Sequence, residues 1–237
     1  MAAGPGDDVR GRERLKDTAH DVMLQDMKTR LRQRFNRTVA AAGLDVEDFE
    51  RLDIQYSGRG RHYHDWNHIA ECLEQFDDIV PLLRDPLAVE LALWFHDAVY
   101  EPGGTHNEAD SALMALRMIE PADGQLARKV QHFIEATSYT GSSVPVDPDL
   151  DYLLDIDLAP FGKPFDAFWE DVLRLDREDS DENQSIRRTR RLEFYRRILD
   201  GRFELFRTPF FRERYLERAL DNVRRAVVLL ELPDDRS

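Results

Sequence analysis

The chain has 237 residues, of which 42% are hydrophobic and 34% are charged, so it is long enough and apolar enough to bury a core. Its formal net charge is −14. This charge disfavours binding to nucleic-acid polymers and to anionic membrane surfaces, because both depend on Lys and Arg that neutralise phosphates.

The single cysteine, Cys72, excludes an intrachain disulfide and is typical of a reducing compartment. Residues 1–8 lack the charged and then apolar pattern of a signal peptide. No run approaches the roughly 18 consecutive apolar residues of a membrane helix. We therefore expect a cytoplasmic protein that neither spans nor binds a membrane.

Residues 1–12 are Gly, Pro and charged residues without periodicity, and we expect them to form a disordered tail. Over 13–42, apolar residues recur at three- and four-residue steps, which predicts a long amphipathic helix closed by Gly43. A second helix is expected over 45–56. Small and basic residues then break the pattern over 57–61.

Two helices follow that carry most of the histidines. The first is expected to develop from 62–69 and to end before Pro81. Asp85 and Pro86 have the form of an N-cap followed by proline at the first helical position, and they open the second. Residues 90–100 of that second helix are apolar nearly all round, so we expect them to be buried.

Six further helices are expected, over 105–119, 125–138, 150–161, 164–177, 182–199 and 211–232. Thr105 and Glu108 have the spacing of a capping box. Acidic and apolar residues alternate over 150–161, which could indicate a strand, but no other segment offers a partner strand. The sequence predicts one all-α domain over 13–232, followed by a tail over 233–237.

His96 and Asp97 stand side by side in the apolar segment 90–100. Burial of an unpaired ionisable pair is costly, so this pair calls for a metal ion or a satisfied hydrogen-bond network. Asp155 and Asp157 interrupt another apolar segment and raise the same expectation.

A second group of candidates lies in the cluster His62, His64 and His68. His64 and His68 are an i, i+4 pair and would face one way if the helix has already started, as in zinc-binding helices. The alternative is that these histidines cap the helix or pack against Tyr63 and Trp66. Two imidazoles and two carboxylates form a mixed site suited to Mn, Mg, Co, Ni, Fe or Zn.

Four motifs follow one another along the chain. They read Arg61-His62-Tyr63-His64-Asp65-Trp66-Asn67-His68, Phe95-His96-Asp97-Ala98-Val99-Tyr100, Asn107-Glu108-Ala109-Asp110-Ser111-Ala112 and Asp155-Ile156-Asp157-Leu158. In type and order they resemble the motifs of HD-domain metal-dependent phosphohydrolases, most closely those of a bacterial subgroup of predicted phosphohydrolases. The resemblance covers about residues 15 to 232 and implies a helical bundle of the HD-domain type.

The resemblance also implies a set of metal ligands, namely His64, His96, Asp97 and Asp157. His68 could replace His64 as the first ligand, and Asp155 could replace Asp157 as the last. Relatives often carry a histidine after an Ala-Thr pair, where this chain has Ala136-Thr137-Ser138-Tyr139. This departure counts against a second, His-rich metal site.

The expected activity is hydrolysis of a phosphoester of a small metabolite or nucleotide by a metal-activated water. Asp97 would be both a ligand and the residue that orients the water. Glu101 and Glu108 are candidates for proton transfer or for support of a ligand histidine, although Glu108 also fits the capping box. Arg59 and Arg61 could clamp the phosphate or could be solvated loop charges.

Two other functions are compatible with the same motifs: a di-iron oxygenase, which some HD-fold proteins are, and a helical protein that binds metal or ligand without turnover. The arginines of 187–191 alternate with acidic residues along an expected helix. We interpret them as surface ion pairs and not as a nucleic-acid patch.

Overall fold

The computed structural model describes residues 6–44, 49–139, 147–178 and 184–232, and of residues 6–21 it describes the backbone alone. Ten α-helices, two short 3-10 segments and no strand make up the regular structure of these residues. The prediction of an all-α protein is therefore confirmed. The segment that alternates acidic and apolar residues is helix α7 (Pro148–Leu158) and not a strand.

The other α-helices, in chain order, are α1 (Gly6–Ala41), α2 (Phe49–Tyr56), α3 (Trp66–Ile79), α4 (Pro86–Phe95), α5 (Asn107–Ile119), α6 (Gly124–Ala136), α8 (Phe165–Glu178), α9 (Gln184–Leu199) and α10 (Pro209–Glu231). The 3-10 segments are η2 (Val80–Leu82) after α3 and η3 (Ala159–Gly162) after α7.

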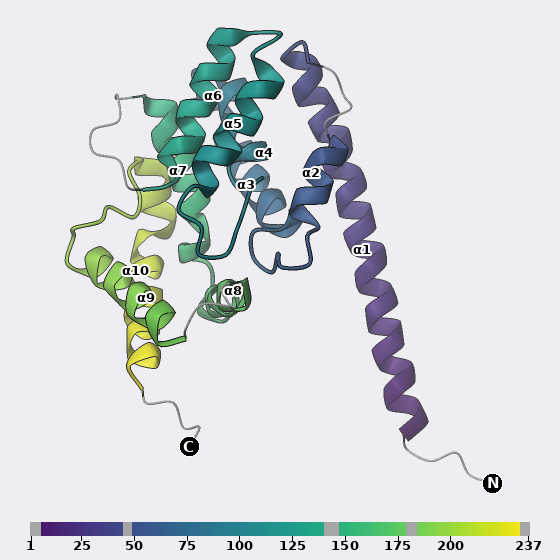
Figure 1. Ribbon diagram of the computed structural model, residues 1–237. Coiled ribbons are helices and arrows are strands. Elements are labelled where there is room, and N and C mark those ends of the chain that lie inside the picture. Colours follow the sequence, from purple (N-terminus) through teal and green to yellow (C-terminus); the bar gives the residue numbers. More distant parts are fainter. Residues whose placement is uncertain (1–5, 45–48, 140–146, 179–183, 233–237) are drawn as a thin grey trace.

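Helix α4 is the centre of the bundle, and α1, α3, α5, α6 and α7 all pack against it (Figure 1). Its buried residues lie on every side of the helix: Ala88, Val89, Leu91, Ala92, Leu93, Trp94 and Phe95. The expected burial of 90–100 is thus confirmed for residues 91–96 and for Ala98, whereas Glu90, Asp97, Val99 and Tyr100 are half-buried. The hydrophobic core around it is one continuous cluster that reaches from Leu31 in α1 to Ala226 in α10.

Helix α1 begins at Gly6, inside the segment 1–12 for which a disordered tail is predicted. The helix thus begins seven residues before the predicted start at residue 13. Gly43 follows the helix end with φ of 71°, as expected for the closing glycine. Residues 1–5 and 233–237 lie outside the described residues.

Helix α4 ends at Phe95, five residues before the predicted end, and His96 is its C-cap. The predicted capping box of α5 is also wrong, because the N-cap of that helix is His106 and makes no side-chain hydrogen bond there. The side chain of Asn107 instead binds both backbone groups of Glu101, at 2.9 and 3.0 Å. This pair of hydrogen bonds fixes the loop between the two helices.

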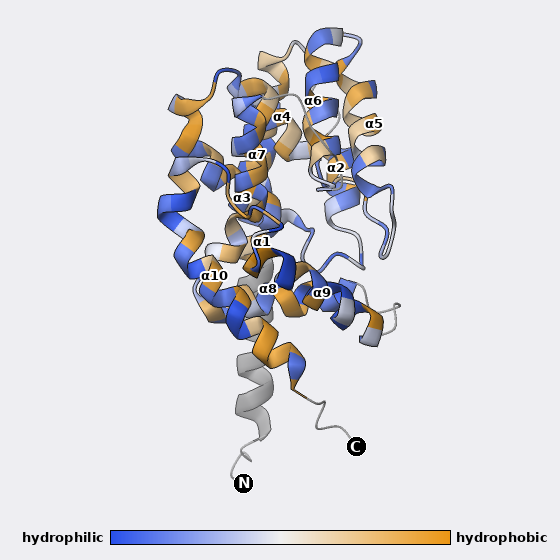
Figure 2. Cartoon of the chain, turned by 90° about the vertical axis from the view of Figure 1, so that its left-hand side faces the viewer, coloured by the Kyte–Doolittle hydropathy of each residue, from blue (hydrophilic) through white to orange (hydrophobic). Residues whose placement is uncertain are grey.

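The C-terminal helices form a second layer beyond the end of α7. Helix α10 packs against η3, α9 and α8, and η3 also contacts α8. Figure 2 shows hydrophilic residues along much of α9, which is unusual for a helix inside such a layer. None of the helices in the described ranges has a stretch long and apolar enough to cross a membrane.

Candidate metal centre

The start of α3 positions His68. Asp65 is the N-cap, and its Oδ1 atom accepts hydrogen bonds from the backbone N–H groups of Asn67 at 2.8 Å and His68 at 3.4 Å. The indole of Trp66 is buried, and its Nε1 atom donates to Asp53 at 2.7 Å. His68 therefore projects into the core from the first turn of a helix that is anchored at its end.

The end of α4 positions His96. Its backbone N–H donates to Ala92 O at 2.9 Å, and its Nδ1 atom lies 3.0 Å from Leu93 O. A carbonyl oxygen can only accept, so Nδ1 carries the proton in this hydrogen bond. The lone pair of the neutral ring is then on Nε2, the arrangement that metal-binding histidines usually have.

The last residues of α7 position Asp157. Its Oδ2 atom accepts a hydrogen bond of 2.7 Å from the phenol of Tyr139. Tyr139 adopts φ of 53°, a left-handed conformation that costs free energy for a residue with a side chain. This backbone conformation follows directly after α6 and places the phenol beside Asp157.

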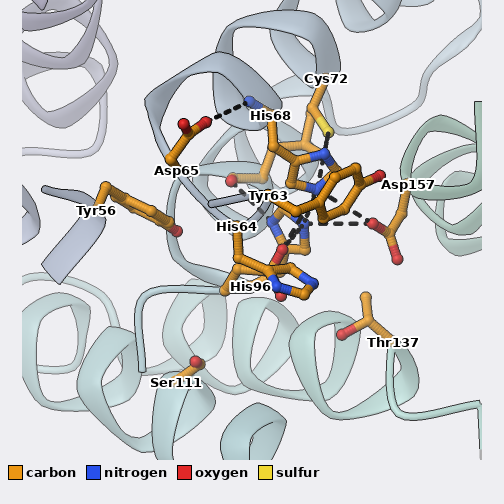
Figure 3. Close-up of polar contacts among 12 residues, drawn as sticks. Tyr56, Tyr63, His64, Asp65, His68, Cys72, His96, Ser111, Thr137 and Asp157 are labelled. Carbon is orange, nitrogen blue, oxygen red and sulfur yellow. Dashed lines mark hydrogen bonds and ion pairs between the residues drawn. The ribbon is translucent and has the colours of Figure 1, made fainter. Parts of the chain in front are cut away.

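Four side chains meet between α3, α4 and α7: His68, His96, Asp97 and Asp157 (Figure 3). The two Nε2 atoms of the histidines are 3.2 Å apart. Asp97 Oδ2 is 3.0 Å from His96 Nε2 and 3.3 Å from His68 Nε2. Asp157 Oδ1 is 3.4 Å from each of them. Four potential ligand atoms thus converge on one point.

These separations fit a single metal ion. Ligand atoms about 2.1 Å from an ion are about 3.0 Å apart at right angles and about 3.4 Å apart at the tetrahedral angle. Five of the six separations among these atoms run from 3.0 to 3.4 Å, and the sixth, between the two carboxylates, is within 4.8 Å. Two imidazoles and two carboxylates suit a divalent cation of borderline or hard character. The cluster could therefore hold a metal ion.

The electrostatics of the cluster are those of anionic carboxylates beside imidazoles. Burial disfavours the charged form of Asp97, but His96 and the neighbouring histidines hold the pKa of this carboxyl well below its usual range. Burial likewise opposes protonation of His96, yet Asp97 and Asp157 raise the pKa of this imidazole well above its usual value. Protons and a cation therefore compete for the same ring nitrogens.

His64 lies beside the cluster but is not part of it. Its Nδ1 atom is 2.6 Å from Glu178 Oε2, and its ring centroid is 6.1 Å from that of His68. Of the two histidines considered in the first motif, the structure places His68 in the cluster. The ring of His64 is held by Glu178, which leaves Nε2 as the nitrogen that can face the neighbouring cavity.

Glu178 is a residue that the sequence analysis missed. Its Oε1 atom accepts hydrogen bonds from the backbone N–H groups of His62, Tyr63 and His64 at 2.7, 2.8 and 2.9 Å. It continues the buried stripe of α8 formed by Phe168 and Val172. The sequence does contain a signal for this role, because Glu178 occupies a position in the apolar stripe of α8. A carboxylate that is buried at such a position needs hydrogen-bond partners.

Asp155 is also buried, but it faces away from the cluster. Its carboxylate accepts hydrogen bonds from Arg207 N at 2.8 Å, Thr208 N at 2.8 Å and Thr208 Oγ1 at 2.6 Å. Burial raises the pKa of Asp155 to about 6. Of the two aspartates in the last motif, the structure places Asp157 in the cluster and Asp155 at the start of α10.

The guanidinium of Arg61 is occupied by backbone carbonyls. It donates to the O atoms of His64, Asp97 and Ala98 at 2.9, 2.6 and 2.7 Å. These hydrogen bonds tie the loop before α3 to the turn that carries Asp97. The phosphate clamp expected from Arg61 is therefore at odds with the structure, in which the side chain holds the centre together.

The remaining candidates lie outside the cluster. Arg59 and Glu101 are exposed, and Glu108 is half-buried in the first turn of α5. None of the three lines the cavity described next. Their expected roles in substrate binding and proton transfer stay predictions without a contact to support them.

Asp157 and His64 open onto a cavity of about 520 Å³. Its walls combine arginines of α9 with aromatic rings, among them Arg187, Arg190, Arg191, Arg197, Phe161 and Phe194. Arg191 does make the surface type of ion pair expected from the sequence, with Asp176 at 2.6 Å. The interpretation of the whole run as surface charge missed that one face of it lines a cavity.

Cys72 adds a second possible ligand set. Its Sγ atom is 3.6 Å from His68 Nε2, and His68, Cys72 and His96 could also hold an ion. In Figure 3 the thiol lies on the side of His68 away from His64. Both sets use the same two histidines, so they describe alternative coordination of one centre.

Comparisons of the chain with models of protein families, with curated proteins and with solved structures found no match. Fold and site together define the class: an all-α bundle with a buried cluster of two histidines and two aspartates that could hold a metal ion.

Proposed function

We propose that this protein is a metal-dependent phosphohydrolase of the HD-domain type, acting on a phosphoester of a small molecule. One observation carries the proposal. The cluster of His68, His96, Asp97 and Asp157 shares a residue, Asp157, with a cavity that α9 lines with arginines. A cation site beside guanidinium groups is suited to an anionic substrate that reacts at the cation.

Each residue of the cluster has a part in this proposal. His68 and His96 would bind the ion through Nε2, and Asp97 and Asp157 through one carboxylate oxygen each. A divalent ion bound there would supply Lewis acidity and a water of lowered pKa. Tyr139 holds the second oxygen of Asp157, which keeps that carboxylate oriented when its other oxygen is engaged.

The surroundings of the cluster would bind and orient the substrate. The arginines of α9 offer donors that match phosphoryl oxygens. His64 in its protonated form would donate from Nδ1 to Glu178 and from Nε2 to a phosphoryl oxygen. Phe161 and Phe194 would shield the reacting group from bulk water. The order of the sequence motifs that resembles HD-domain phosphohydrolases supports the same assignment.

The described residues favour hydrolysis over the chemistry of a di-iron oxygenase. Both sets of potential ligands in the described residues contain His68 and His96, so the two sets cannot each hold an ion at the same time. A di-iron enzyme needs ligands for two ions at once.

The test is a screen for phosphate release with Mn, Mg, Co and Ni on p-nitrophenyl phosphate and phosphorylated metabolites. We expect metal-dependent turnover that a chelator abolishes. Asp97→Ala should reduce kcat/KM by about 100-fold or more with unchanged helical content. Asp110→Ala, which removes an exposed aspartate of α5, is the matched control. A protein that binds metal stoichiometrically but hydrolyses none of the esters would favour a binding role instead.

A further inference from the structure

Helix α9 carries arginines on the same stripe as its buried Ile198; Arg187 and Arg191 are half-buried and Arg190 is exposed. The stripe follows the i, i+3, i+4, i+7 spacing and consists of Arg187, Arg190, Arg191, Phe194 and Ile198. Such a stripe is ordinarily apolar, because it packs against the core. In α9 only the second half of the stripe is apolar. It consists of Ile198, which is buried, and Phe194, which is partly buried.

The arginine half of the stripe faces the cavity that contains Asp157. Arg197 from the next turn also lines this cavity, which gives four guanidinium groups from one helix. The acidic side chains there are Asp157 itself and Glu193, and Asp176 binds Arg191 from outside at 2.6 Å. In a chain of net charge −14, this is a local concentration of positive charge that composition does not explain.

Another part of the cavity wall is apolar and aromatic. Phe161 and Phe194 lie with ring centroids 6.2 Å apart, and Leu158 and Tyr195 extend the same surface. A volume of about 520 Å³ lies in the usual range for a small organic ligand, about 300 to 1,000 Å³. The cavity therefore suits a molecule with both a planar or apolar part and negative charge.

A second cavity, of about 660 Å³, lies beside the first and shares Arg197 with it. Its lining combines Arg197, Arg202, Arg207 and Tyr139 with the acidic Glu135, Asp151 and Glu204, and Arg207 pairs with Asp151 at 3.3 Å. Tyr139 is the residue that binds Asp157. The two cavities share Arg197, and together they offer more room than one phosphoryl group fills.

On the basis of the function proposed above, we propose that the substrate carries at least two phosphoryl groups and a planar or apolar group. One phosphoryl group reacts at the cluster, and the other is bound by Arg190 and Arg197 of α9. Hydrolysis forms a bond between the water oxygen and the reacting phosphorus and breaks its ester P–O bond, and the released oxygen takes up the proton. The planar group lies on Phe161 and Phe194.

The test measures anion binding as well as turnover, with the metal-loaded full chain. Inorganic pyrophosphate and orthophosphate are titrated calorimetrically into the wild type and the double variant Arg190→Gln/Arg197→Gln. The control is Arg196→Gln, which removes one positive charge from α9 at a position outside the cavity lining, where Arg196 pairs with Glu231 at 2.8 Å. Kinetics on aryl esters with one and with two phosphoryl groups accompany the titrations.

We expect wild-type protein to bind pyrophosphate about tenfold more tightly than orthophosphate. The double variant should lose about tenfold or more in pyrophosphate affinity with little change for orthophosphate, and the control should match the wild type. In the wild type, the aryl ester with two phosphoryl groups should have a lower KM than the ester with one. This difference in KM should disappear in the double variant.

Equal losses for both anions, no loss, or the same loss in the control would overturn the inference. The proposed function is judged separately. Turnover without discrimination between the two anions refutes this inference and leaves the phosphohydrolase intact. Absence of turnover with arginine-dependent pyrophosphate binding refutes the hydrolase and leaves an anion-binding site on α9.

Discussion

Glu178, the last residue of α8, binds the Nδ1 atom of His64 at 2.6 Å across 114 positions of the chain. The same carboxylate receives three backbone N–H groups of the loop that leads into α3. This one side chain therefore fixes both a histidine at the edge of the candidate centre and the loop before His68. The geometry of the centre depends on the C-terminal layer as well as on the bundle.

The first prediction concerns the pH dependence of stability. Burial would raise the pKa of Glu178, but His64 and the backbone N–H groups lower it overall, below the ordinary value of 4.5. A carboxyl whose pKa is lower in the folded protein contributes stability above its unfolded pKa, and this contribution is lost as the pH falls through the folded value. The free energy of unfolding should therefore drop below about pH 4.5.

Urea unfolding from about pH 6 to about pH 3 checks this dependence. Part of the acid-induced loss should be missing in Glu178→Gln, whose unfolding free energy should also be lower at neutral pH by about 1 to 3 kcal/mol. Glu193→Gln, at an exposed position of α9, should follow the wild-type curve. Parallel curves for wild type and Glu178→Gln would show that Glu178 has no such role.

The second prediction separates the two aspartates of α7. Asp157→Asn should remove most of the stabilisation that a bound divalent ion provides, about 2.7 kcal/mol when the ion is at 100 times its Kd. For a chain of this size that corresponds to a loss of about 5 to 10 °C in the metal-induced rise of Tm. Asp155→Asn should keep the metal-induced rise.

Asp155→Asn should instead lower the stability of the metal-free protein, by about 1 to 3 kcal/mol, because Arg207 N and the two donors of Thr208 lose a charged acceptor. Thermal unfolding with and without Mn or Co measures both effects. If the metal-induced rise of Tm were lost in Asp155→Asn and kept in Asp157→Asn, Asp155 and not Asp157 would be the metal ligand.

The third prediction separates the histidines of the first motif. His68→Gln should abolish the metal-induced rise of Tm, because Nε2 of His68 lies within 3.4 Å of the other three ligand atoms. His64→Gln should retain the metal effect and reduce phosphoester turnover. Metal titrations followed by calorimetry, together with the phosphate assay, distinguish the two; loss of metal binding in His64→Gln alone would contradict the assignment.

The fourth prediction tests the support of Asp157. Tyr139→Phe deletes one hydroxyl and the hydrogen bond of 2.7 Å to Oδ2. We expect metal affinity to fall by about 10-fold, the lower end of the range for residues that orient a ligand. Tyr215→Phe removes a comparable hydrogen bond, to Gln75 at 2.7 Å, that involves none of the four ligands, and it should leave the affinity unchanged. Equal affinities in Tyr139→Phe and wild type would mean that the phenol does not orient Asp157.

The sequence predicts the helices well because their apolar spacing is regular, and it predicts the deep burial of α4 because its residues are apolar all round. The choice between His64 and His68 was harder, since residues four apart share a face only inside a helix. Helix α3 starts at Trp66, with Asp65 as its N-cap, so His64 lies before the helix. Asp65, a residue type that favours the N-cap position, is therefore the feature of the sequence that indicates where α3 begins.

Other parts of the candidate site depend on contacts between distant segments. Asp155 and Asp157 are two positions apart on α7 and face opposite ways, and only the packing of Thr208 against Asp155 decides which side each one takes. Glu178 and the arginines of α9 reach the centre through the placement of the C-terminal layer. No local pattern specifies that placement.

The metal content of the purified protein tests the central claim most directly. After loading with Mn or Co and dialysis, the account predicts about one ion per chain in the wild type and in His106→Gln, which changes an exposed histidine. His96→Gln should retain no stoichiometric metal, because His96 Nε2 is a ligand in both possible sets. A full equivalent of metal in folded His96→Gln would contradict the account.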